Sequence, residues 1–414
     1  MTRFILGLIF SRTGLSVGYT VPIQLLLVLR VGELATDPAP VVGLVIGVGA
    51  AVSLVTSPIA GRVTDVVGAR FGRRRTWVAF GSVSAGLALA ALGLADQLWQ
   101  VFVLWCLVQL LSNFQAAATD GMFADQAVGA RQGRTSGLAG LSTLLGPLLG
   151  LGLAGVFPAG SAGQWYAIAA VTVLFGLVTV FLVRDTPAAP REHRSSAPAL
   201  WIRPFRARTF RAAWILRFLA TCSIATVLLG GAYVVQRFDM DTEESAGAIT
   251  RLLLVSTVVA VVSGVAAGYW TDRRREQKPT LVVSGILCAV GAMSVALAPT
   301  FSLVLVGVVV HAVGIGAFIA VDFALCARLL PDPEHAGKDM AIFGLASAIP
   351  QAIVPLALPV LLPLGGFTLF YSVFAVLGLV ALLTLRAIPE IGAEPASPES
   401  PESAVPGSVG ADGR

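Results

Sequence analysis

Charged side chains are scarce in this chain of 414 residues. Lysine, arginine, aspartate and glutamate together make up 12% of it, whereas a soluble domain carries about 25%. Apolar and aromatic residues account for 56%. Because so few charges cannot cover a water-facing surface, the composition excludes a soluble multidomain enzyme and a disordered protein. It indicates a chain whose main partner is the lipid bilayer.

Histidine and cysteine are also rare, with three and four copies. The cysteines lie singly in apolar stretches and the histidines are scattered, so neither a disulfide framework nor a metal site is predicted. The sequence contains no phosphate-binding P-loop and no catalytic-triad spacing. We therefore expect no cofactor and no enzymatic activity. The net charge is only +5, and the arginines fall in short loops, so nucleic acid is not an expected partner.

Long uncharged runs fill most of the chain. A bilayer needs about 20 apolar residues per helix, and twelve runs of that kind are separated by charge, proline or glycine. They are too long and too continuous for barrel strands, so the sequence predicts an all-α polytopic membrane protein with twelve transmembrane helices. The runs cover residues 4–29, 41–60, 76–95, 98–119, 136–157, 165–183, 211–236, 247–270, 279–298, 301–327, 340–362 and 367–387.

Arginine and lysine gather in alternate loops. One side of the predicted bundle holds only Arg30, Arg237 and Arg251. The positive-inside rule makes the richer side cytoplasmic, together with both termini, and predicts a multi-pass protein of the cell membrane. The richer side holds Arg62, Arg70, Arg73, Arg74, Arg75, Arg131, Arg134, seven arginines between residues 184 and 211, Arg273, Arg274, Arg275, Lys278, Arg328 and Lys338.

The chain contains an internal repeat. Gly61 and Asp65, followed by an arginine cluster, match Gly268 and Asp272 at an offset of 207 residues. The repeat predicts two six-helix bundles in the same orientation, at residues 1–183 and 210–388. The basic segment 184–209 links them and is expected to lie along the membrane surface. The tail 389–414, rich in Pro, Ser, Glu and Gly, is expected to be disordered.

The repeated loop, Gly-x-x-x-Asp followed by arginines, resembles the signature loop of the major facilitator superfamily. Within it, the run from Asp65 to Trp77, with Arg-x-Gly-Arg-Arg-Arg, is most similar to the glycoside and sucrose cation symporter branch. Val66 departs from that branch, which has a basic residue there. The resemblance implies the major facilitator fold, which we expect as a monomer, and secondary active transport by alternating access.

The resemblance also implies a cytoplasmic gate at these loops. Asp65 would meet the start of span eleven near Lys338, and Asp272 would meet the start of span five near Arg134. The glycines would let helix ends approach closely. The alternative is that the arginines are only a topology signal. The gate set comprises Gly61, Asp65, Arg73, Arg74, Arg134, Gly268, Asp272, Arg273 and Lys338.

Five ionisable residues lie within the predicted spans, where charge is costly and marks pathways. Their depths match in pairs, and the resemblance implies that spans one, four, seven and ten line a central cavity, so we expect two pairs, Arg12 with Asp120 and Arg217 with Asp322. Gln115 occupies the repeat position of Asp322, so we expect Asp322 to be the proton-exchanging residue. Permanent salt bridges are the alternative for both pairs. His311 is a candidate proton relay, and a hydrogen-bonded core histidine is the alternative.

Amide and aromatic side chains near these charges predict a cavity for a small organic solute. Amides beside a ring face are the combination that recognises sugars and glycosides, and helix packing is the alternative reading. The predicted cavity residues are Tyr19, Gln24, Trp105, Gln109, Asn113, Gln115 and Tyr233.

The coupling ion and the direction of transport are open at this stage. Span two contains no acidic residue of the kind that sodium-coupled relatives place there, so protons are the expected coupling ion. Span five contains Gly146-Pro147 and Gly150, which partly resemble the motif of proton-antiporting drug exporters. The hypotheses are therefore a proton-coupled transporter of a sugar-like solute, a drug or metabolite exporter of the same superfamily, and a transport-inactive receptor or scaffold.

Overall fold

The structure is a computed structural model that describes residues 2–67, 72–126, 145–183, 203–238, 240–274, 276–328 and 336–388. In those ranges the chain is all helical. The first half contains α1 (Thr2–Val21), η1 (Pro22–Leu26), α2 (Leu27–Leu34), α3 (Pro38–Val66), α4 (Arg73–Leu92), α5 (Leu98–Gln126), a short apolar helix Leu145–Ala154, and α7 (Ala162–Leu182).

The second half follows the same order. It contains η3 (Arg203–Arg206), α9 (Arg208–Ile224), η4 (Ala225–Leu229), α10 (Gly230–Arg237), α11 (Thr242–Arg274), α12 (Lys278–Leu297), α13 (Phe301–Arg328), α14 (Ala336–Ala381) and η6 (Leu382–Ala387).

The number of spans among the described residues agrees with the twelve predicted. Ten helices are long and apolar enough to cross a membrane, and Leu145–Ala154 is a shorter apolar helix. The segment Asp339–Ala387 contains two of the predicted spans, because the backbone leaves the helical region at Gly365 and Gly366. The predicted fold class is therefore confirmed.

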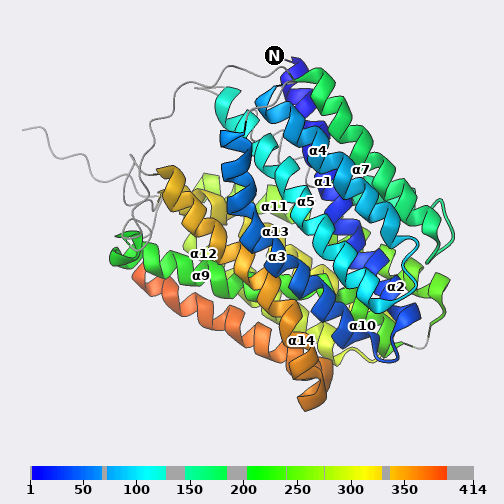
Figure 1. The fold of residues 1–414 in the computed structure, drawn as a ribbon. Coiled ribbons are helices and arrows are strands. Elements are labelled where there is room, and N and C mark those ends of the chain that lie inside the picture. The colour runs from blue at the N-terminus through cyan, green and yellow to red at the C-terminus, as the bar shows by residue number, and fades with distance from the viewer. Residues whose placement is uncertain are drawn as a thin grey trace, which may run out of the picture.

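Each half is a bundle of its own (Figure 1). In the first half α1 packs on α7, α4 packs on α5 and α7, and α3 packs on α5. In the second half α13 packs on α11 and α12, while α14 packs on α9 and α12. Apolar side chains cover the outside, as lipid requires: Leu87, Phe181 and Val265 are each more than two-thirds exposed.

The two bundles meet along α3 and α14 (Figure 1). Glycine permits this contact, since a methyl group at Gly43 would stand 2.6 Å from the Pro355 carbonyl oxygen. A methyl group at Gly47 would stand 3.0 Å from the Leu356 nitrogen. Residues of both halves, including Val42 and Leu358, share one buried apolar cluster. The two halves are thus sealed together by small residues facing large ones.

Two polar contacts between the halves lie at the same end of the bundle. The Ala159 amide donates a hydrogen bond to Glu243 Oε1 at 2.9 Å. The Gln236 side-chain amide donates to Asp37 Oδ1 at 3.1 Å. We call this end, formed by residues 22–47, 92–98, 158–163, 225–238, 240–243 and 295–301, the closed end.

The opposite end carries most of the arginines and is called the basic end. It is formed by residues 60–67, 72–75, 115–126, 203–217, 268–274 and 276–278, with the C-terminal end of η6. Carboxylates stay accessible there: the side chains of Asp65 and Asp120 are 45% and 65% exposed. Asp120 is accessible although it lies within α5, so the bundle is open toward the basic end.

The first helix of each half is interrupted at a corresponding depth. η1 is a π-helical turn that starts at Pro22, which lacks a backbone N–H, and η4 is a 3-10 turn between α9 and α10. Such interruptions of the hydrogen-bond ladder often mark hinges. Both lie near the closed end, where a bend would change the contact between the halves.

The junction within α14 generates a prediction about stability. Gly366 has φ 62° and ψ −162°, a region essentially restricted to glycine. We expect Gly366→Ala to lower the free energy of unfolding by about 1–3 kcal/mol, measured by thermal denaturation in detergent. Gly344→Ala is the control, because Gly344 is helical with open space around it. Equal melting temperatures for the two variants would contradict the strain argument.

Candidate functional site

Arg217 and Asp322 form a buried ion pair in the second half. Arg217 Nε lies 3.3 Å from Asp322 Oδ2, and the two side chains are 17% and 11% exposed. The same nitrogen donates a hydrogen bond to Ser347 Oγ at 2.7 Å. Three helices, α9, α13 and α14, thus converge on one guanidinium. A group between an acid and a hydroxyl on different helices can change partners when the helices move.

Arg12 and Asp120 form the corresponding contact in the first half. Arg12 Nη2 lies 2.6 Å from Asp120 Oδ1. Their side chains are 34% and 65% exposed, so solvent screens this pair more than it screens Arg217 and Asp322. The structure therefore brings together both pairs that the sequence predicts, in two different environments.

Gln115 takes the repeat position of Asp322 and is fully buried. Its amide nitrogen lies 3.3 Å from Ser11 Oγ, and the Ser11 and Thr119 hydroxyls are 2.7 Å apart. These neutral hydrogen bonds join α1 to α5. The first half thus uses an amide where the second half uses an ionisable carboxylate.

His311 lies inside the second bundle, apart from Arg217 and Asp322. The histidine is 5% exposed, and its ring hydrogen-bonds to the backbone of Ser223. Its Nε2 atom has no partner among the described residues. The ring borders a cavity of about 30 Å³ that Tyr233 and Tyr371 also line. The volume equals that of about two water molecules, but most of the lining residues are apolar, among them Leu252, Val304 and Val308.

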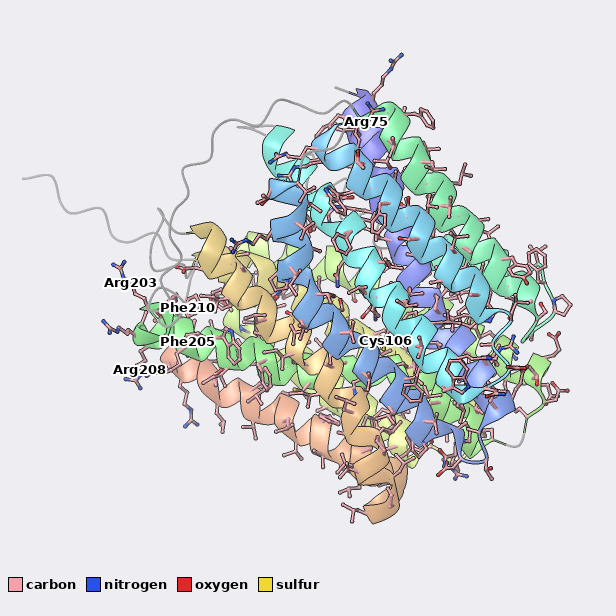
Figure 2. All side chains as sticks on the ribbon, viewed as in Figure 1. Arg75, Cys106, Arg203, Phe205, Arg208 and Phe210 are labelled. Carbon is pink, nitrogen blue, oxygen red and sulfur yellow. The ribbon has the colours of Figure 1, made fainter. Side chains whose placement is uncertain are left out.

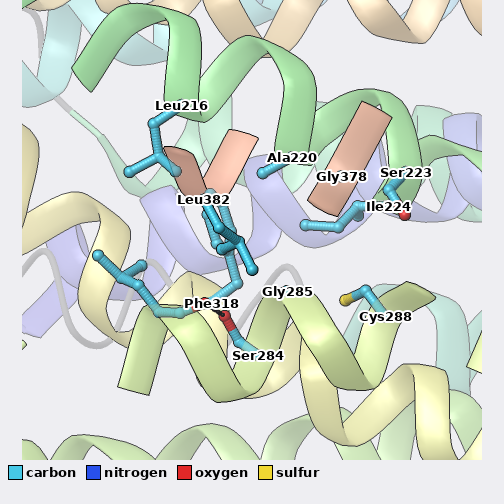
Figure 3. Close-up of a pocket in the computed structure, with 11 residues that line it drawn as sticks. Leu216, Ala220, Ser223, Ile224, Ser284, Gly285, Cys288, Phe318, Gly378 and Leu382 are labelled. Carbon is cyan, nitrogen blue, oxygen red and sulfur yellow. Dashed lines mark hydrogen bonds between the residues drawn. The ribbon is translucent and has the colours of Figure 1, made fainter. Parts of the chain in front are cut away.

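A second small cavity lies between α9, α12, α13 and α14 (Figure 3). Its volume is about 10 Å³, too small for an organic solute. Leu216, Ile224 and Phe318 border it with small residues such as Ala220 and Gly285. This cavity is a packing gap in the core of the second bundle.

Trp105, Gln109 and Asn113 occupy one face of α5 at helical spacing, and that face packs on α3. Trp105 is fully buried against Gly49. The Asn113 amide nitrogen donates to Thr56 Oγ1 at 2.7 Å and to the Ser53 carbonyl at 3.1 Å. The Trp105 Nε1 and Gln109 Nε2 atoms have no partner among the described residues. The face therefore joins two helices of the first half and retains two spare donors.

The remaining predicted cavity residues are divided between the interface and the second bundle. Tyr19 lies at the interface of the halves and donates to Gln351 Oε1 at 3.2 Å. Gln24 belongs to η1 and is half-buried, with its backbone carbonyl against Gly231. Tyr233 is fully buried and donates to the Val295 carbonyl at 2.9 Å, within an aromatic cluster that includes Tyr371.

The sequence analysis missed Ser347 and Gln351, which both lie on α14 and face the other functional side chains. The available signal was the polar spacing within span eleven, four residues apart and beside Pro350. Such a spacing places both side chains on one helix face.

The signature loop of the first half forms an intact network. Asp65 Oδ1 lies 2.9 Å from Arg74 Nη2, and Arg73 donates to the Asp65 carbonyl at 2.9 Å. Arg74 is buried, and its guanidinium lies where a side chain at Gly121 of α5 would stand. Gly121 is thus a further residue that this loop requires.

The two signature glycines are not crowded in this arrangement. A methyl group at Gly61 would meet nothing within 4 Å, and one at Gly268 would meet only Ala320 Cβ at 3.9 Å. This differs from the expected close approach of helix ends at these glycines. The difference arises because the bundle is open at the basic end.

The rest of the predicted gate is partly outside the described residues. Arg134 lies outside them, and so do the side chains of Asp272 and Lys338, although α11 and α14 include both positions. Arg273 is exposed at the end of α11. The predicted tail 389–414 and residues 184–202 of the predicted linker 184–209 also lie outside the described ranges, whereas residues 203–209 form η3 and the start of α9.

Comparisons with known proteins agree with this architecture. Residues 4–265 and 214–410 match the family described as Major Facilitator Superfamily. The structure resembles that of a D-xylose-proton symporter with a TM-score of 0.71 and 16% identity, covering 94% of this chain and 98% of that one. It resembles an inward-facing, occupied bacterial homologue of the human lysosomal transporter Spinster with a TM-score of 0.70 and 14% identity, covering 95% and 98%.

Among curated sequences, the chain is 26% identical over 235 residues to Multidrug resistance protein MdtG of Escherichia coli (strain UMN026). The match covers 54% of this chain and 53% of that protein, so the chain spans about half the length of the curated relatives it matches. With its two helical bundles and the family match over most of its length, the chain belongs to the Major Facilitator Superfamily of membrane transporters.

Proposed function

We propose that the protein is a proton-coupled secondary transporter that moves a small organic solute by alternating access. The observation that carries the proposal is the contact of Arg217 with both Asp322 and Ser347. A proton on Asp322 would convert the carboxylate to a neutral acid and weaken its attraction to Arg217. Arg217 would keep the Ser347 hydroxyl, so protonation changes the link between α13 and the other two helices.

The open basic end is proposed to face the cytoplasm, with both termini on that side. Its arginines fit the positive-inside rule. In the opposite state the basic end would close and the α3–α14 contact would separate. We propose that Asp65 then braces against the start of span eleven near Lys338, and Asp272 against span five near Arg134.

The proposed solute site lies where the halves meet at mid-depth. Tyr19 and Gln351 offer a hydroxyl and an amide from opposite bundles, so a solute inserted between them would touch both. Hydroxyls and amides hydrogen-bond the ring substituents of sugars and glycosides. The spare Trp105 and Gln109 donors support the same solute class if α3 and α5 separate during transport.

A second candidate function is proton-coupled export of drugs or metabolites. The similarity to MdtG favours it, and so does the close packing of span five on α1. A side chain at Gly146 would collide with Ser16, and one at Gly150 would collide with Val21. The two candidates differ in the solute and in the direction of proton flow.

Solute-evoked proton movement in proteoliposomes tests the proposal and separates the candidates. Vesicles containing a pH-sensitive dye are exposed to D-xylose, sucrose, an aryl glycoside and a cationic drug, each without an imposed gradient. A symported sugar should acidify the interior as it enters, whereas an antiported drug should draw protons out. No pH change and no counterflow with any solute would contradict transport and favour the receptor or scaffold.

Asp322 is predicted to be the coupling residue. An imposed gradient of one pH unit supplies about 1.4 kcal/mol per proton. With one proton coupled to each solute molecule, this is equivalent to about tenfold accumulation of the solute. We expect Asp322→Asn to lose this accumulation while counterflow continues, because an amide cannot release a proton. Asp120→Asn is the control and should keep accumulation, since Asp120 is largely exposed. Undiminished uphill transport in Asp322→Asn would remove Asp322 from this role.

The seam between α3 and α14 generates a prediction about conformation. Gly47→Val would place methyl groups against Leu356 and should prevent the closed end from sealing. The variant should expose the closed end to an aqueous thiol reagent at a cysteine placed at Leu358, and it should slow counterflow. Gly152→Val is the matched control, because nothing lies within 4 Å of Gly152. Equal labelling rates in both variants would show that the seam is not the seal.

A further inference from the structure

Four arginines form a surface at the basic end of the second bundle. Arg206, Arg208, Arg211 and Arg386 are all exposed. Arg206 ends η3, Arg208 and Arg211 lie in the first turn of α9, and Arg386 lies at the end of η6, which packs on α9. Figure 2 shows Arg203 and Arg208 extending outward from this end of the molecule, beside Phe205 and Phe210. We call the four arginines the headgroup surface.

The polarity of the exposed helix faces changes at this level. On α9 the exposed positions 208, 211 and 215 share one face, and they read Arg, Arg and Ile toward the middle of the helix. On η6 the exposed positions are Leu383 and then Arg386 at its end. Exposed apolar residues belong in hydrocarbon and arginines belong at its boundary, so the headgroup surface lies at the level of the lipid headgroups.

Aromatic packing fixes this segment on the bundle. The Phe205 ring lies edge-on to Phe210 and Trp214, with centroids 5.6 Å apart in each case. Trp214 Nε1 donates to the Ile342 carbonyl of α14 at 2.9 Å. Arg211 donates to the Phe205 carbonyl at 3.3 Å. These aromatic contacts and hydrogen bonds to carbonyl groups therefore hold the backbone that presents the arginines.

The charges of the headgroup surface are not neutralised within the part of the chain that the structure describes. Arg206, Arg208 and Arg386 make no hydrogen bond or ion pair there, and Arg211 donates its hydrogen bond to a neutral carbonyl. Two arginines of the signature loop in the first half differ, since Arg74 pairs with Asp65 and Arg75 donates to the Val180 carbonyl.

The geometry points to a binding site for the phosphate of anionic phospholipids at the headgroup surface. A guanidinium binds phosphate through two parallel hydrogen bonds, and its long stem reaches the bilayer interface from an apolar helix. Because α9 and η6 are neighbours, they place several guanidinium groups at one depth in the membrane. One phosphodiester can contact two of these arginines. An anionic lipid there holds α9, the helix that carries Arg217, at a fixed depth.

The test measures lipid preference of the full-length protein in nanodiscs and does not depend on the solute. The probes are phosphatidylcholine nanodiscs with and without phosphatidylglycerol, read by native mass spectrometry of retained lipid. One arginine near an anionic surface is worth about a fivefold preference, so Arg208→Gln with Arg211→Gln should reduce retention of phosphatidylglycerol roughly 25-fold. Arg208→Lys with Arg211→Lys should keep part of the phosphatidylglycerol retention, because lysine keeps the positive charge but cannot form two parallel hydrogen bonds.

Arg3→Gln with Arg62→Gln is the control, with the same charge change on exposed residues of the first bundle. We expect it to keep the preference for phosphatidylglycerol. An equal loss of retained phosphatidylglycerol in both double variants would show that only general surface charge matters, and it would overturn the proposal. Unchanged retention in Arg208→Gln with Arg211→Gln would also overturn it. Inorganic phosphate should not displace the bound lipid; full displacement would assign the surface to free phosphate instead. Thermal denaturation confirms that each variant is folded.

Discussion

The cost of placing charge inside an apolar bundle constrains this structure more than any other factor. A lone charge at membrane depth costs several kcal/mol, so Arg217 and Asp322 must have partners in every state that the protein visits. In this state the partners are each other and Ser347. A helix movement that separates one contact must supply another, which restricts the protein to a few discrete arrangements. In the proposed mechanism, this restriction would let a proton at Asp322 influence the packing of three helices.

The two halves share a plan and differ in its chemistry. Both begin with an interrupted helix, and both place an arginine about two turns into it. In the first half, the Arg12–Asp120 pair is partly exposed to solvent. The first half also has Gln115 at the position where the second half has Asp322. Neutral hydrogen bonds from Gln115 to Ser11 hold their geometry whatever the pH. Under the proposed mechanism, this asymmetry would assign scaffolding to the first bundle and proton sensitivity to the second.

The sequence predicted the large-scale features because lipid allows few alternatives. Twelve apolar runs and the loop arginines determine the helices, and the 207-residue offset of Asp65 and Asp272 identifies the two halves. The depth of Arg12 and Arg217 in their helices, together with the cavity-lining spans that the family resemblance implies, predicted their aspartate partners. These features depend on length and charge, which a linear sequence displays directly.

The rotation of each helix was not predictable in the same way. A polar residue in an apolar span can face a cavity or a neighbouring helix, and composition does not decide between them. Asn113 packs between α3 and α5, and Tyr233 lies in an aromatic cluster of the second bundle. The need for glycine at position 121 was also not predicted, because it follows only from the position of the Arg74 guanidinium, which would overlap a side chain there.

Distances between spin labels across the two ends would test alternating access most directly. One pair joins Val66 and Arg206 at the basic end, and the other joins Leu94 and Leu297 at the closed end, each as cysteine variants in a background without native cysteines. The account predicts two populations, in which the basic-end distance shortens as the closed-end distance lengthens, with a pH dependence that Asp322→Asn abolishes. A single distance at both ends, unchanged by pH and by every solute, would contradict it.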